Sequence, residues 1–158
     1  MKASETINST LISGENPLGT IIACNISTLQ FLNYSINGTN YSYTAPADSL
    51  FQYAKPQNTP PSILINAYNF LSNNTQSSAN LIFVQPGIAV NSLQNLLSFN
   101  CPQLNATSTI VSPISIKITA YGSIGGFMAG NFNGTFRGPA PGNISYVVTC
   151  SFRVRRNQ

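Results

Sequence analysis

The sequence contains no histidine and no tryptophan, and its only acidic residues are Glu5, Glu15 and Asp48. Without an imidazole, neither a Ser-His-Asp nor a Cys-His nucleophile can be assembled, and a zinc site loses its commonest ligand. Glu5 and Glu15 lie in a polar leader, so only Asp48 remains for chemistry that needs several carboxylates, such as glycoside hydrolysis or hard-cation binding. The sequence therefore predicts a protein that is not an enzyme and that holds no metal or cofactor.

Charge is also scarce: 6% of the residues are charged, against about 25% in a typical soluble domain. Asn, Ser and Thr supply the polar surface instead, with 20, 19 and 13 copies. Such a composition is common in secreted surface proteins, so we expect an extracellular protein or one on the outer cell surface. A chain of 158 residues can bury one core. We divide it into a polar leader or tether, residues 1–18, and a single domain, residues 19–158.

The three cysteines, Cys24, Cys101 and Cys150, allow at most one internal disulfide, and their spacings match no zinc or redox motif. They are either small buried apolar residues or include one disulfide pair. Cys24 follows Ile21–Ala23, which imitates the motif before a lipid-modified cysteine, but the basic start and apolar run of a signal are missing. No stretch approaches the roughly 18 apolar residues of a membrane span. We therefore expect no transmembrane segment and place any export signal upstream of this sequence.

Residues 32–43 carry the clearest local pattern, a β-hairpin around Asn37–Gly38. Apolar and polar residues alternate on both sides of this dipeptide, which favours a two-residue type I′ turn. The predicted pairs are Ile36 with Thr39, Ser35 with Asn40, Tyr34 with Tyr41, Asn33 with Ser42, and Leu32 with Tyr43. This register places the large apolar groups on one face, so the three tyrosines are predicted to be core residues rather than a platform for a sugar.

Period-two alternation predicts further strands along most of the chain. These strands cover residues 20–27, 62–70, 81–84, 114–119, 128–136 and 146–154. Four prolines make residues 45–61 a predicted loop, with one helical turn near Asp48–Tyr53. Residues 88–99 fit either a short helix or an irregular strand. The predicted fold class is therefore all-β, a mostly antiparallel β-sandwich of about eight or nine strands.

Several segments of the C-terminal third resemble the ending of certain proteins of the Bacteroidota. They are Thr119–Gly122 with Gly125–Phe127, then Gly130–Thr135, then Cys150–Arg156. The Ile36–Thr39 turn with its aromatic second strand is similar to the usual opening of the same group, which comprises uncharacterised secreted proteins and outer-surface lipoproteins. The resemblance spans residues 20–156 in outline. It implies a β-sandwich presented outside the cell and a signal with its lipidation motif removed from the front, and it brings no known active site.

After the last acidic residue, every charge in the chain is positive. Strand alternation places Lys117, Arg153 and Arg155 on outward faces, and with Arg137 and Arg156 they form a candidate basic strip. These residues either keep the surface soluble and protect a sheet edge, or bind an anionic glycan, lipid phosphates or another negatively charged partner. Nucleic acid is not expected as a partner, because the cations are few and no stacking aromatics interleave with them.

The main functional prediction is a structural or adhesive role at the cell surface. The alternative is a carbohydrate-binding module for glycans, including anionic ones, which an exposed row of coplanar aromatic rings would favour. A remote alternative is a hydrolase of unfamiliar type, with Asp48 or a lysine beside a serine in a pocket. Self-association through an open sheet edge is a further predicted interaction, with residues 5–13 either pairing as an edge strand or forming a disordered chain end.

Overall fold

The computed structural model describes residues 29–70, 76–85 and 90–157, and the regular structure of these residues consists of β-strands. The strands are β1 (Phe31–Ile36), β2 (Thr39–Thr44), β3 (Ser49–Lys55), β4 (Ser62–Phe70), β5 (Gln76–Val84), β6 (Leu93–Asn100), β7 (Thr109–Ile110), β8 (Ser115–Tyr121), β9 (Phe127–Arg137) and β10 (Ser145–Arg155). No helix in this part of the chain is long and apolar enough to cross a membrane. The leader, the predicted strand 20–27 and Cys24 lie outside the described residues.

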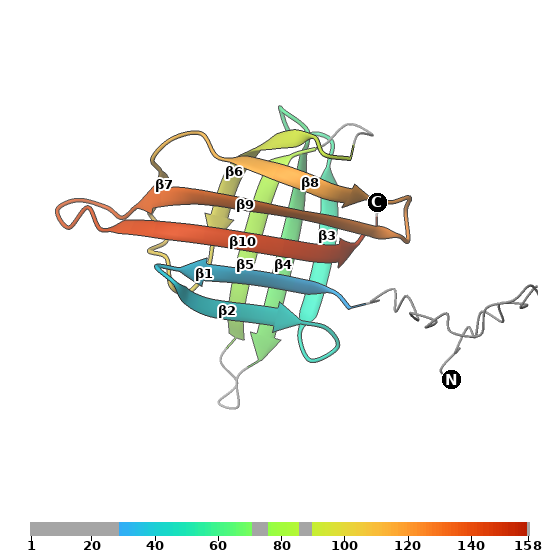
Figure 1. Ribbon diagram of the computed structural model, residues 1–158, viewed down its shortest axis with the longest axis horizontal. Coiled ribbons are helices and arrows are strands. Elements are labelled where there is room, and N and C mark those ends of the chain that lie inside the picture. The colour runs from blue at the N-terminus through green and yellow to red at the C-terminus, as the bar shows by residue number, and fades with distance from the viewer. Residues whose placement is uncertain (1–28, 71–75, 86–89, 158) are drawn as a thin grey trace, which may run out of the picture.

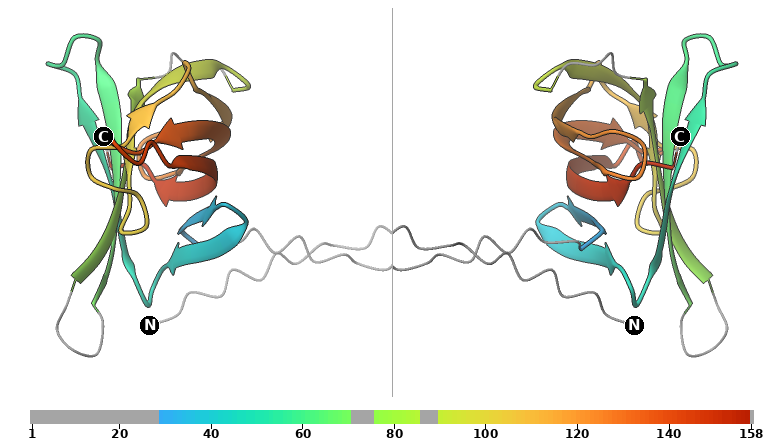
Figure 2. Two further views of the ribbon diagram at one scale, coloured as in Figure 1. Left: turned by 90° about the vertical axis from the view of Figure 1, so that its left-hand side faces the viewer. Right: turned by 90° about the vertical axis from the view of Figure 1, so that its right-hand side faces the viewer.

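Hydrogen bonds join nine of the strands in the order β2-β1-β10-β9-β8-β6-β5-β4-β3, and each neighbouring pair is antiparallel. The short strand β7 pairs with the end of β9 beside this path. In Figure 1 the strands β8, β9, β10, β1 and β2 cross steeply over β3, β4 and β5. Figure 2 shows the same two layers from the side. The outward faces of the two layers therefore point in opposite directions.

Strand β6 connects the two layers into one sheet. Its first residues, Leu93–Asn95, pair with β8, whereas Leu96 and Ser98–Asn100 pair with β5. The register skips Leu97 between Ile82 and Phe83, so β6 itself carries a bulge, and a bulge bends the strand that carries it. A short helix or an irregular strand was predicted for residues 88–99; in their described part, residues 90–99, the irregular strand is correct and the helix is wrong.

The prediction of an antiparallel all-β fold is confirmed, but its description as a β-sandwich is too specific. A sandwich consists of two sheets that are not joined by strand pairing. Here the ladder continues through β6, and the ten strands form one barrel-like sheet that nearly closes on itself. The difference arises because β6 pairs with β8 in one layer and with β5 in the other.

The two ends of the sheet, β2 and β3, follow each other in the chain and are joined by a tight turn. Asp48 fixes this turn, since its backbone N–H donates to the Thr44 oxygen at 3.0 Å and its carboxylate accepts the Thr44 N–H at 2.6 Å. Beyond β10, the backbone N–H of Asn157 donates to Gln52 Oε1 of β3 at 2.9 Å. A turn and a side chain thus bridge the gap that strand pairing leaves open.

The hairpin β1–β2 has the predicted geometry. All five predicted pairs between residues 32–36 and 39–43 are present. Asn37 and Gly38 have φ of 49° and 85°, the positive values that a type I′ turn requires. The three tyrosines of the hairpin are buried or packed against the core, which confirms their predicted structural role.

One hydrophobic core fills the space between the layers. Its side chains come from alternate positions of the strands, and Phe83, Phe136 and Phe152 are its largest fully buried members. Cys101 and Cys150 also belong to the core as free thiols, so no disulfide joins these two cysteines.

Strand β3 was not anticipated by the sequence pattern. The predicted loop over residues 45–61, with its helical turn, is wrong in its centre, because Ser49–Lys55 is an edge strand. The prolines lie outside the strand, and both of its faces carry apolar side chains: Leu50 is buried beside the polar, fully buried Gln52, whereas Phe51 and Tyr53 are each 41% exposed on the other face. With a polar residue inside and aromatic residues outside, the strand has no hydrophobic period that the sequence could reveal.

Candidate functional site

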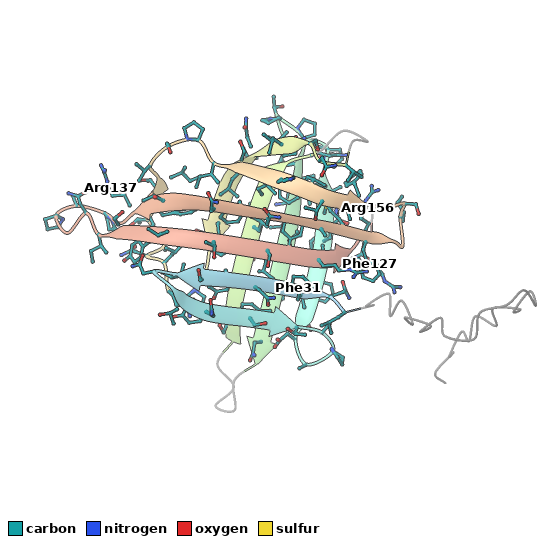
Figure 3. All side chains as sticks on the ribbon, in the orientation of Figure 1. Phe31, Phe127, Arg137 and Arg156 are labelled. Atoms are coloured by element: carbon teal, nitrogen blue, oxygen red, sulfur yellow. The ribbon has the colours of Figure 1, made fainter. Side chains whose placement is uncertain are left out.

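The structure places the members of the candidate basic strip in three different regions. Strand β10 turns alternate side chains to opposite faces, so Arg153 and Arg155 lie outward while their neighbours pack in the core. Lys117 is exposed on β8, two strands away from β10. Arg137 lies at the opposite end of the sheet from Arg156, as Figure 3 shows. The fold therefore gathers Arg153, Arg155 and Arg156 at one end of the front layer and leaves Arg137 at the other.

Phe127, at the start of β9, organises this end of the layer. It is the register partner of Arg155, and its ring centroid lies 4.2 Å from Cζ of Arg153 and 5.7 Å from Cζ of Arg155. A guanidinium stacked on a ring is held by cation–π attraction and keeps its N–H groups at the rim of the stack. Phe31, opposite Arg153 on β1, flanks the other side of the pair. Two guanidinium groups are thus positioned by one aromatic ring.

Arg156 has a different, structural role. Its backbone N–H donates to the Gly126 oxygen at 2.8 Å, and its own oxygen accepts the Gly125 N–H at 2.8 Å. Its guanidinium lies 4.0 Å over the Tyr121 ring and donates a short hydrogen bond to the Gly122 oxygen. These contacts tie the end of the chain to the turn between β8 and β9. Arg153 and Arg155 are therefore the cations of this group that remain for a ligand.

The Arg153–Arg155 pair has no acidic counterpart among the described residues. Asp48 is the only carboxylate there, and the Thr44 N–H occupies it in the turn between β2 and β3. Guanidinium groups present planar pairs of N–H donors that match carboxylate, sulfate and phosphate oxygens. The pair is thus chemically suited to one anionic group that bridges both arginines.

An uncharged polar hollow lies on the same outward face, beside the arginine pair. It has a volume of about 370 Å³, and its lining includes Asn33 of β1, Asn131 and Asn133 of β9, and Ser151 of β10. Ser151 is two positions before Arg153, so it lies next to it on the same face of β10. Amide and hydroxyl groups donate and accept hydrogen bonds, as the hydroxyls of a sugar require. The hollow and the arginines together place neutral hydrogen-bonding groups next to two guanidinium groups.

The other reactive side chains are buried in the core. Burial raises the pKa of the Cys150 thiol well above its ordinary value and also raises the pKa of the Cys101 thiol. Burial likewise raises the pKa of the Tyr34 hydroxyl, which donates to Gln103 Oε1 at 2.7 Å. These groups stay protonated near neutral pH and act as packing residues. In the described part of the chain, no three His, Cys, Asp or Glu side chains gather where they could hold a metal ion.

Phe127 and the polar hollow were missed by sequence reasoning, because both depend on the pairing of strands that the sequence does not specify. The alternation of Asn131 and Asn133 with apolar residues was the only signal, and it indicates an outward face rather than a site. The chain matches no protein-family model, no curated protein and no solved structure. The resemblance to secreted Bacteroidota proteins therefore stays a prediction, and the site is interpreted from its own geometry.

Proposed function

We propose that this chain is a non-enzymatic, exported domain that acts in adhesion at the cell surface by binding an anionic glycan or another negatively charged envelope component. The observation that carries the proposal is the pair of guanidinium groups stacked on Phe127 with no described carboxylate beside it. The ligand's acidic group binds Arg153 and Arg155, and its neutral sugar hydroxyls extend into the hollow lined by Asn131 and Ser151.

Two electrostatic effects support binding at this place. Arg153 and Arg155 are two residues apart on one strand, so their backbones are about 7 Å apart and their charges repel each other. An anion that bridges them removes this repulsion. The formal net charge of +4 also attracts polyanions over distances of the order of the Debye length.

The position of β10 distinguishes binding from edge protection. Cationic side chains often guard an exposed strand at the edge of a sheet. β10 lies between β1 and β9 and is therefore an internal strand. Arg153 and Arg155 cannot block edge-to-edge pairing from there, which favours a role in recognition.

The test is binding to polymers of defined charge. We would measure affinity for polygalacturonate, which carries carboxylates, for dextran sulfate, and for neutral dextran, together with binding to phosphatidylglycerol vesicles as the lipid-phosphate arm. The test variant is R153Q/R155Q, and the matched control is K55Q/R137Q, which removes the same charge elsewhere. We expect the wild type to bind at least one acidic polymer, and R153Q/R155Q to lose at least tenfold in affinity while the control stays within twofold.

Two outcomes would count against the proposal. If both double variants weaken binding equally, the attraction is a property of the net charge and not of a site. If the wild type binds neither acidic polymer nor the vesicles at low salt, the arginine pair is only a solubilising feature.

A further inference from the structure

A second surface of interest lies on the outward face of β3, β4 and β5, on the opposite side of the molecule from the arginines (Figure 2). Phe51 and Tyr53 of β3 are each 41% exposed there. The ring centroid of Phe51 lies 6.3 Å from that of Tyr53 and 6.4 Å from that of Tyr68 on β4. Three aromatic rings therefore form one cluster around Phe51, in which Tyr68 is partly buried.

The strand register continues this cluster as a row of amide side chains. Phe51 is opposite Asn66, Asn66 is opposite Asn80, and Asn80 is opposite Asn100. Neighbouring strands lie about 4.8 Å apart, so the row from β3 to β6 extends over roughly 14 Å. At its far end, Asn80 and Asn100 line a hollow of about 370 Å³ with Ser78. The face thus offers aromatic rings at one end, amides along its length and a hollow at the other end.

The chemistry of this face is uncharged throughout. Lys55, at the end of β3, is the only charged residue between Ser49 and Asn100 in the sequence. The Oδ1 atom of Asn66 is buried beside the ring cluster and has no hydrogen-bond partner among the described residues. Because this oxygen is shielded from solvent, a ligand can meet only the remaining surface of the Asn66 side chain, which is partly buried. An anion has no counterpart here, whereas a neutral ligand with many hydroxyls does.

We propose that this face is a second binding site, which takes an uncharged oligosaccharide. The rings of Phe51, Tyr53 and Tyr68 pack against the C–H faces of the sugar rings, as aromatic side chains do with apolar surfaces. The amides of Asn80 and Asn100 exchange hydrogen bonds with the hydroxyls at the rims, and Asn66 lies in the row between them and Phe51. The length of the row suits a chain of several sugars and not a single one.

A second copy of this protein is the competing occupant, because β3 is an edge strand with exposed apolar side chains. One observation favours the sugar. The outer edge of β3 is occupied at Gln52, whose backbone oxygen accepts the Asn157 Nδ2–H group at 3.4 Å. The rings are tilted, with interplanar angles of 31° and 56° to Phe51, so they do not form one coplanar row, and each ring packs against a different sugar unit of the chain.

The test uses neutral hexasaccharides on the whole chain. Cellohexaose, xylohexaose and mannohexaose would be titrated by calorimetry into the wild type and the variants F51A, F51Y and N66A. I144A is the matched control, because Ile144 is a large exposed residue (58%) outside this face. We expect binding of at least one hexasaccharide, a loss of tenfold or more in F51A, a smaller loss in N66A, and affinity within threefold of wild type in F51Y and I144A. The melting temperature of each variant shows that it is folded.

The result that overturns the proposal is the absence of binding to all three hexasaccharides, or equal affinity in F51A and the wild type. A dimer in light scattering that F51A abolishes would assign the face to a second copy and also overturn it. R153Q/R155Q should bind the neutral sugars normally, so failure of this site and failure of the arginine site are separate results.

Discussion

Gly130 of β9 offers the sharpest test of the packing between the front strands and the core. It is buried, and a Cβ atom placed on it would lie 2.8 Å from the backbone oxygen of Lys117 on β8 and 2.8 Å from Cζ of Phe152 on β10. Both distances are shorter than any normal van der Waals contact. The absence of a side chain at this position is therefore what allows Phe152 to lie across β9.

The expected cost of Gly130→Ala follows from which atoms can move. The Lys117 oxygen belongs to the backbone of β8, and the Phe152 ring is 1% exposed, so neither can shift freely. Overpacking a core costs about 1–3 kcal/mol, and immobile neighbours favour the upper half of this range. Replacing glycine also restricts the unfolded chain, which returns about 0.4–1 kcal/mol. The net loss is about 2 kcal/mol, or roughly 4–8 °C in Tm for a chain of this size.

Thermal unfolding followed by circular dichroism measures this loss, and Gly142→Ala is the control. A Cβ atom on Gly142 meets only Ile144 Cγ1, at an ordinary 3.7 Å, so that variant should gain up to about 1 kcal/mol from the unfolded state alone. If Gly130→Ala melts within 1 °C of the wild type, or shifts in the same direction as Gly142→Ala, the close approach of Phe152 to β9 is refuted.

Three further predictions concern the turn, the buried thiols and the leader. Gly38→Ala should lower the free energy of unfolding by about 1 kcal/mol. The cost comes from the φ of +85° alone, because no atom lies near the new Cβ. An unchanged Tm would contradict the type I′ turn. Since burial raises the pKa of Cys101 and Cys150 above the ordinary 9.0, the unfolded state ionises first as pH rises. The free energy of unfolding, measured by urea titration, should therefore be constant below about pH 9 and fall above it. The fall should be smaller in Cys150→Ala. A free energy of unfolding that does not change above about pH 9 would refute the burial of these thiols. We expect deletion of residues 1–18 to leave the oligomeric state in light scattering and the Tm unchanged, as for a tether, whereas a change in either would indicate edge pairing.

The hairpin over residues 32–43 could be predicted from the sequence because two independent signals agreed. The Asn37–Gly38 dipeptide favours one turn type, and the alternation on either side fits only the register that this turn imposes. The long C-terminal strands β9 and β10 were recognisable for a similar reason. Every second residue of each strand faces the core, as Met128 and Phe132 do on β9 and Cys150 and Phe152 do on β10. The local sequence pattern is sufficient to predict a strand where one of its faces is buried and the other is polar.

The closure of the sheet could not be predicted in this way. Whether β6 pairs on one side or on both depends on its own bulge at Leu97 and on partner strands that the local pattern does not specify. The candidate site could not be predicted either, for the same reason. The alternation placed Arg153 and Arg155 on an outward face, but only the pairing of β9 with β10 brings Phe127 beneath them and sends Arg137 to the far end.

Strand β3 joins the question of folding to the question of function. Its sequence buries Gln52, whose Nε2 has no hydrogen-bond partner among the described residues, and exposes Phe51 and Tyr53. An unsatisfied buried amide costs about 1–3 kcal/mol, and the exposed rings contribute little to the core. Exchanging the polar and aromatic positions of the strand would satisfy the hydrophobic pattern better. Local choices that oppose the fold are expected where another requirement acts on the residue. The sugar site that we propose on the outward face of β3 supplies such a requirement for Phe51 and Tyr53.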